Sequence, residues 1–134
     1  MGSILIVDDN AEIRETLRIL LSGLGEISEA SNGKEALLRI ETQKPKLILL
    51  DIAMPEISGI AVLQAALKAD PSVIVLMLTG EYDIEIAKSA LEIGARAYIT
   101  KPFDGPKLRG EIAKIMGIDG ATGNADSYRP WRVA

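Results

Sequence analysis

The chain has 134 residues, of which 48% are hydrophobic and 25% are charged, the length and composition of a single globular domain. Its net charge of -4 disfavours a nucleic-acid-binding surface, which is usually basic. It contains neither cysteine nor histidine, which excludes from this chain disulfides, thiolate or imidazole metal sites and Ser-His-Asp catalysis. Chemistry carried by these residues must therefore use carboxylates, hydroxyls and amines.

Aliphatic runs alternate with amphipathic segments along the chain. Residues 4–7, 47–50 and 73–78 are apolar throughout, which is typical of buried parallel strands, and shorter strands are expected at 26–30 and 97–99. The predicted helices carry their apolar stripes over residues 13–24, 36–40, 60–67, 83–93 and 108–116. Strands that alternate with helices predict an α/β domain with a parallel sheet.

Polar residues follow the strands at the edge where open α/β sheets bind their ligands. Asp8 and Asp9 follow the first strand, Asp51 the third, Thr79 the fourth and Lys101 the fifth. Three converging carboxylates repel one another unless a cation joins them, and oxygen ligands favour Mg²⁺, Mn²⁺ or Ca²⁺. A hydroxyl and an ammonium beside them complete a site suited to a phosphoryl group.

Each of these residues also has an ordinary structural interpretation when taken alone. Asp9 or Asn10 could cap a helix, and Asp51 could end a strand and cap a turn. Lys101 and Pro102 could form a surface loop. Their coincidence at a single sheet edge favours a functional site.

Four motifs carry these residues in a fixed order. They are ILIVDDN at 4–10, LLDIAMP at 49–55 with Gly59 after it, LTG at 78–80, and YITKPF at 98–103. Together, from Ile4 to about Met116, they resemble the receiver domain of two-component response regulators. The resemblance implies a flavodoxin-like, doubly wound, five-stranded parallel sheet in the order 2-1-3-4-5 with five helices. We expect a receiver domain over residues 1–117 and a flexible tail over 118–134.

The resemblance implies a phosphoacceptor and a metal site. Asp51 would accept a phosphoryl group from a phosphohistidine on a sensor histidine kinase or a histidine phosphotransfer protein. Asp8, Asp9 and Asp51, with the backbone carbonyl of Ala53, would bind Mg²⁺, or alternatively Mn²⁺. Ala53 and Glu81 would tune the rate of dephosphorylation. The chain would catalyse only its own phosphorylation and dephosphorylation, so we do not expect an enzyme.

The resemblance also implies a switch. Thr79 and Lys101 would assist the chemistry at Asp51, and Thr79 would then hydrogen-bond the acquired phosphoryl group. Tyr98 would turn inward as the Thr79 loop moves. The Lys101–Pro102 peptide bond would be cis and would direct the lysine to the site.

The expected output is protein contact. The output face would comprise the helix that begins near Asp83, the strand at Tyr98 and the helix around Leu108. Ile84 and Ile86 lie on different sides of one helix, so one of them would lie on a partner surface. Alternatively, the core-facing stripe of this helix is broad enough to include both. We expect a cytoplasmic chain with a downstream protein target and no direct contact with nucleic acid or membrane. It would be a monomer or a phosphorylation-dependent dimer.

Three alternatives remain open at this point. The chain could be a receiver from a longer regulator or hybrid kinase with a DNA-binding or enzymatic output domain. It could be a phosphatase of the haloacid dehalogenase type, although that family needs a second acid where Ala53 stands. A nucleotide- or flavin-binding domain is the weakest alternative, because no glycine-rich phosphate loop follows the first strand.

Overall fold

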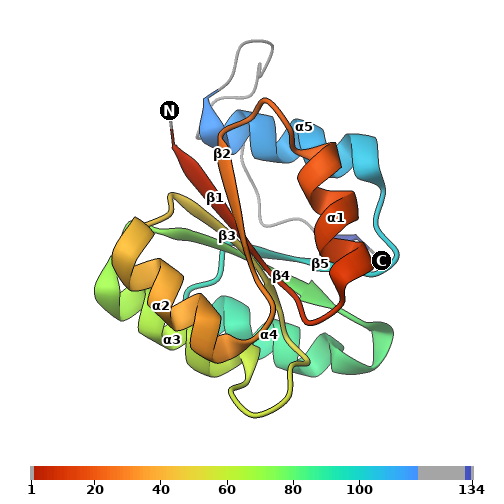
Figure 1. Ribbon diagram of the computed structural model, residues 1–134. Coiled ribbons are helices and arrows are strands. Elements are labelled where there is room, and N and C mark those ends of the chain that lie inside the picture. The colour runs from red at the N-terminus through yellow and green to blue at the C-terminus, as the bar shows by residue number, and fades with distance from the viewer. Residues whose placement is uncertain (1, 118–131, 134) are drawn as a thin grey trace.

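The computed structural model describes residues 2–117 and 132–133, and it has a central sheet between two layers of helices (Figure 1). The strands are β1 (Ser3–Val7), β2 (Glu26–Ala30), β3 (Leu47–Asp51), β4 (Ile74–Thr79), β5 (Ala97–Thr100) and β6 (Arg132–Val133). They lie in the order β2-β1-β3-β4-β5-β6, and every neighbouring pair is parallel. The predicted order of the first five strands is confirmed.

Five α-helices occur in the described part of the chain, as the sequence predicts. They are α1 (Ala11–Leu20), α2 (Gly33–Gln43), α3 (Gly59–Ala69), α4 (Ile84–Ile93) and α5 (Gly105–Met116), and a short 3-10 turn, η1 (Glu81–Asp83), precedes α4. Helices α1 and α5 cover one face of the sheet, and α2, α3 and α4 cover the other (Figure 1).

Both faces of the central strands are buried, which explains their continuous apolar sequences. Leu5 and Val7 of β1 pack toward α2, α3 and α4, whereas Ile4 and Ile6 pack toward α1 and α5. All four side chains are fully buried. Alternate residues of a strand point to opposite faces, so a strand covered on both sides requires apolar residues at every position. The resulting core fixes the strand ends that carry the site.

The predicted extent of the first helix is wrong at its C-terminal end. The apolar spacing continues to residue 24, but α1 ends at Leu20, and a turn follows in which the Leu24 amide donates to the Leu21 carbonyl. Gly23, in this turn, has a φ of 88°, a left-handed conformation that favours glycine and is incompatible with continued helix. Leu21 and Leu24 still pack into the core, so their helical spacing reflects burial beyond the helix.

Strand β6 was not predicted. In the register of the sheet, Tyr98 of β5 pairs with Arg132 and Ile99 pairs with Val133. These two residues belong to the segment for which we expect a flexible tail. The other residues of that segment, 118–131 and 134, lie outside the described residues, so its flexibility and the domain boundary at 117 stay predictions.

Gly59, the first residue of α3, is packed directly on the end of β3. A Cβ atom there would overlap the backbone carbonyl oxygen of Asp51 and would lie 2.9 Å from the Cα atom of Ile52. Both obstacles are backbone atoms, which move only with the strand. The helix can therefore approach the sheet this closely only where its first residue has no side chain.

Gly59→Ala is therefore expected to destabilise the fold by about 1–3 kcal/mol, the usual cost of overpacking. Urea denaturation measures this change. Gly110→Ala is the matched control, because Gly110 lies in α5 and a Cβ atom there meets nothing within 4 Å. Equal stability of the two variants would contradict the close approach of α3.

None of the helices in the described residues combines the length and the apolar character that a membrane span requires.

Candidate functional site

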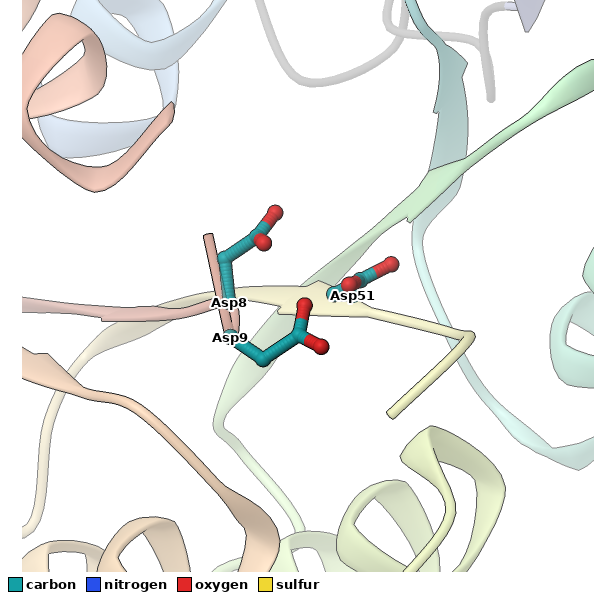
Figure 2. A group of neighbouring side chains, drawn as sticks. All are labelled: Asp8, Asp9 and Asp51. Atoms are coloured by element: carbon teal, nitrogen blue, oxygen red, sulfur yellow. The ribbon is translucent and has the colours of Figure 1, made fainter. Parts of the chain in front are cut away.

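Three carboxylates meet at the carboxyl ends of β1 and β3, as predicted (Figure 2). Asp8 and Asp9 directly follow β1, and Asp51 is the last residue of β3. The two strands are hydrogen-bonded neighbours, and the three side chains can each supply one carboxylate oxygen within 4.8 Å of the others. Asp8 and Asp51 are buried, whereas Asp9 is exposed. The cluster is therefore open to solvent on the Asp9 side.

Asn10, not Asp9, caps helix α1. The Asn10 side-chain oxygen accepts hydrogen bonds from the backbone amides of Glu12 and Ile13, at 2.9 and 3.2 Å. An N-cap residue satisfies amides of the first helical turn in this way. The capping interpretation of Asp9 is thus wrong, and its carboxylate stays available to the cluster.

Lys101 brings a positive charge to the two buried carboxylates. Its Nζ atom lies 2.9 Å from Asp8 Oδ2 and 3.4 Å from Asp51 Oδ1. The lysine follows β5, and its peptide bond to Pro102 is cis. The ammonium of Lys101, just after β5, therefore links the residue that follows β1 with the last residue of β3.

Burial and charge shift the titration of this site. Burial is the main cause that raises the pKa of Asp51 from 3.8 to about 6, and repulsion by Asp8 adds to it, while Lys101 acts in the opposite direction. Burial alone would lower the pKa of the Lys101 ammonium. Its hydrogen bond to Asp8 and the charge of Asp51 outweigh that effect, so the pKa of Lys101 is raised. Asp51 therefore ionises near neutral pH.

The remaining predicted residues surround Asp51 at different depths. Thr79, the last residue of β4, is fully buried, and its Oγ1 atom donates to the Gly80 carbonyl at 2.9 Å. Ala53 is exposed, and its backbone amide donates to Asp51 Oδ1 at 3.2 Å. Glu81 lies in η1, just after β4. The roles predicted for these residues in the chemistry stay predictions.

Tyr98 already occupies an inward position in this structure. It is 5% exposed and belongs to the buried cluster that includes Ala87 and Ala90 of α4. On the same helix, Ile84 packs against this cluster, whereas Ile86 is 43% exposed. The exposed isoleucine of that pair is therefore Ile86.

Arg14 is a supporting residue that our sequence analysis missed. Its Nη1 atom donates to the backbone carbonyl of Asp8 at 2.6 Å, and its Nε atom donates to Glu29 Oε1 at 3.1 Å. Arg18 also pairs with Glu29. The guanidinium of Arg14 thus joins α1 and β2 to the loop that carries Asp8. A basic residue in the second turn of α1 was the available signal, but surface arginines are too common to single it out.

The cluster has the chemistry of a Mg²⁺ site. It offers three oxygen donors from Asp8, Asp9 and Asp51, and a hard divalent cation prefers such ligands to nitrogen or sulfur. Asp8 and Asp51 are both buried, and Lys101 supplies one positive charge for the two carboxylates. The residues present therefore fit a divalent cation.

A model of the response regulator receiver domain matches residues 4–113. The chain belongs to this family. Receiver domains are parts of two-component systems, and the acidic cluster of this receiver domain fits their Mg²⁺ pocket. The nucleotide-binding and phosphatase alternatives are thereby set aside.

Known proteins similar to this receiver domain include both isolated domains and longer regulators. The CheY-like receiver domain protein of Methanospirillum hungatei matches it with a TM-score of 0.81 and 33% identity, over 87% of this chain and 94% of that one. The phosphate regulon transcriptional regulatory protein PhoB of Pseudomonas aeruginosa is 40% identical over 136 residues, 98% of this chain and 57% of PhoB. The probable transcriptional regulator ycf27 of Pyropia yezoensis is 40% identical over 114 residues, 84% of this chain and 46% of that protein. The receiver domain spans about half the length of these curated relatives.

Proposed function

We propose that Asp51 is the phosphoacceptor of a signalling switch, and that its donor is a phosphohistidine of a sensor kinase or phosphotransfer protein. The observation that supports this most is the position of Asp51 at a sheet edge, between two further carboxylates and the Lys101 ammonium. Asp9 and Ala53 are exposed beside it, so a phosphodonor can approach from that side. The chain contains no histidine, so the imidazole of this reaction belongs to the partner.

Asp51 attacks in its ionised form. Its pKa of about 6 leaves most of the carboxylate unprotonated at pH 7 and above. A carboxylate oxygen forms a bond to phosphorus as the bond from phosphorus to the histidine nitrogen of the partner breaks. Asp8, Asp9, Asp51 and the backbone carbonyl of Ala53 would hold Mg²⁺, which when bound neutralises negative charge on the phosphoryl oxygens.

Lys101 and Thr79 act on the phosphoryl oxygens. The Lys101 ammonium already contacts Asp51 Oδ1, so it is positioned to pair with charge that arrives on that side chain. The Thr79 hydroxyl leaves the Gly80 carbonyl and donates to a phosphoryl oxygen instead. That exchange moves the loop after β4. Tyr98 is already inward in this structure, so in this proposal it keeps that position and does not make the inward turn that the sequence predicts. The output surface is the face formed by α4, β5 and α5, and a downstream protein binds it.

Asp51→Asn is expected to abolish phosphorylation by a small-molecule phosphodonor in Mg²⁺, because the amide is not a competent nucleophile. Intact-mass spectrometry detects the added phosphoryl group. Asp70→Asn is the control, since Asp70 is the C-cap of α3, at the end of that helix away from Asp51. A phosphoryl adduct that survives in the Asp51 variant but not in a variant of another aspartate would overturn the assignment.

A second candidate differs in how the signal leaves the domain. The curated relatives are about twice the length of this chain, and their printed names call them transcriptional regulators. On this alternative the same output face, after phosphorylation of Asp51, controls a DNA-binding domain in a longer protein. The reading frame that encodes the chain distinguishes the two, since continuation for a further domain supports the second.

A further inference from the structure

An arginine of α1 bonds the backbone that joins two residues of the acidic cluster. The Nη1 atom of Arg14 donates to the Asp8 carbonyl oxygen at 2.6 Å, and only 17% of the Arg14 side chain is exposed. That carbonyl belongs to the peptide group between Asp8 and Asp9. A peptide group is planar, so its orientation sets the direction in which the chain continues to Asp9. Arg14 therefore holds the part of the loop from which the Asp9 side chain extends.

The Asp9 side chain depends on its backbone for its position. The Lys101 ammonium lies 2.9 Å from Asp8 Oδ2 and 3.4 Å from Asp51 Oδ1, so it holds both buried carboxylates. Within the part of the chain that the structure describes, the Asp9 carboxylate has neither a hydrogen bond nor an ion pair. It is exposed, yet it lies beside Asp8 and Asp51 (Figure 2). Its place in the cluster therefore depends on the backbone of the loop, which Arg14 bonds.

Glu29 of β2 orients the Arg14 guanidinium. The Glu29 Oε1 atom accepts from Arg14 Nε at 3.1 Å, and its Oε2 atom lies 3.2 Å from Nε of Arg18, which is one turn further along α1. A guanidinium is a rigid planar group, so acceptors on two different elements fix its plane. For Arg14 those acceptors are Glu29 and the Asp8 carbonyl. Among the described residues, Arg18 shares Glu29 with Arg14 but forms no hydrogen bond with Asp8.

The charge of Arg14 and its position act on cation binding in opposite directions. A positive charge beside the acidic cluster repels Mg²⁺, so removal of the charge alone would strengthen binding. Loss of the hydrogen bond to Asp8 frees the peptide group, which must then be ordered again when the ion binds, and this weakens binding. The sign of the change in affinity therefore distinguishes the two roles.

We propose that Arg14 is a positioning residue for divalent cation binding at the acidic cluster. It keeps the peptide group between Asp8 and Asp9 in the orientation that brings the Asp9 carboxylate to the cluster, and Glu29 keeps its guanidinium in place. This role rests on the Mg²⁺ site of the proposed function. It extends the support of that site to β2, which supplies none of the three carboxylates.

Titration of the full chain with MgCl₂ at pH 7 and constant ionic strength, followed in ¹H–¹⁵N NMR spectra, measures the Kd of Mg²⁺. In Arg14→Met the Kd is expected to be about tenfold higher than in the unmodified chain, as loss of one hydrogen bond from a charged group predicts. Arg18→Met is the matched control, because it removes the same charge and a contact with Glu29 but leaves the Asp8 carbonyl bonded. Its Kd is expected to be unchanged or slightly lower.

A measurement without metal tests the positional role directly, because the Asp9 amide belongs to the peptide group that Arg14 bonds. In the Mg²⁺-free protein, the NMR order parameter of this amide is expected to fall from about 0.85, the value of rigid backbone, toward 0.6 in Arg14→Met. It should stay high in Arg18→Met. Arg14→Lys is the second variant: it keeps the charge but not the rigid fork, so its Kd should lie between those of the unmodified chain and Arg14→Met.

Two results would overturn the positioning role of Arg14. One is a Kd in Arg14→Met that is equal to or lower than that of Arg18→Met, because charge would then be the only effect of Arg14. The other is an unchanged order parameter at Asp9. Neither measurement uses a phosphodonor, so failure of this role and failure of Asp51 as the phosphoacceptor are recognised separately.

Discussion

Asp51→Asn is expected to stabilise the fold at pH 8 in the absence of divalent cations. The ionised Asp51 carboxylate is buried beside Asp8, and this environment raises its pKa from 3.8 to about 6. That difference corresponds to a destabilisation on the order of 3 kcal/mol when the group is charged. The amide removes the charge, and its oxygen can still accept from the Ala53 amide. Part of the gain is offset by the lost ion pair with Lys101.

The pH dependence identifies the cause of this gain. The folded chain binds the Asp51 proton more tightly than the unfolded chain, because the folded pKa is the higher of the two. The unmodified protein therefore regains this stability as the pH falls through 6 toward 3.8, and the advantage of the variant shrinks over the same range. Above pH 7 the advantage is complete.

Urea denaturation in EDTA at several pH values measures this difference. Asp70→Asn is the control: hydrogen bonds from Ser72 lower the pKa of the exposed Asp70 carboxyl, so its variant should show no gain at pH 8. If the Asp51 variant is no more stable than the unmodified chain at pH 8, the ionised Asp51 carboxylate does not destabilise the fold, and the prediction is wrong.

Lys101→Met is expected to destabilise the fold by about 3 kcal/mol at pH 8 without divalent cations. Its ammonium pairs with Asp8, which is fully buried, and with Asp51. Methionine keeps most of the apolar side chain but removes the charge. Two neighbouring buried carboxylates would then lack the cation between them, and loss of one partner of a buried pair is costly.

Addition of Mg²⁺ should recover part of this loss, because a second cation at the cluster compensates the same carboxylates. Stabilisation by a bound ion grows with its concentration and reaches about 2.7 kcal/mol at a hundredfold excess over Kd. The gain in melting temperature with Mg²⁺ should therefore be larger for Lys101→Met than for the unmodified chain. An equal or smaller gain would contradict the electrostatic link between the lysine and the metal site.

Lys88→Met provides the matched control. Lys88 lies on the exposed side of α4 and pairs with Glu85 at 3.4 Å, an i,i+3 pair open to solvent. Such surface pairs contribute at most about 1 kcal/mol. A similar loss in both lysine variants would mean that the charge on Lys101 has no special role.

The sequence was sufficient for the parts of this domain that depend on local pattern. Apolar runs located the central strands because both sides of those strands are buried, and the polar residues after them located the site because parallel strands end at one edge. The extent of α1 was overestimated because Leu21 and Leu24 are buried for tertiary reasons after the helix has ended.

Other features depend on contacts that have no local pattern. Arg14 supports the loop of Asp8 through a backbone carbonyl, an acceptor that every residue carries. Strand β6 has two residues, too few for a periodicity to be detected, and its partner β5 lies more than thirty residues earlier in the chain. The charge balance that sets the pKa of Asp51 depends on burial, which only the assembled fold determines.

The contact at Gly59 affects how variation at this position should be interpreted. Glycine there lies close to Asp51 in sequence and in space, so a loss of function on its replacement is easily attributed to phosphoryl transfer. The structure gives a sufficient reason without any chemistry, because a side chain would collide with the backbone of β3. In a library of variants selected for folding alone, glycine should persist at position 59 while position 51 becomes free to change. A residue beside a functional site can thus be required only because the fold leaves no space there for a larger side chain.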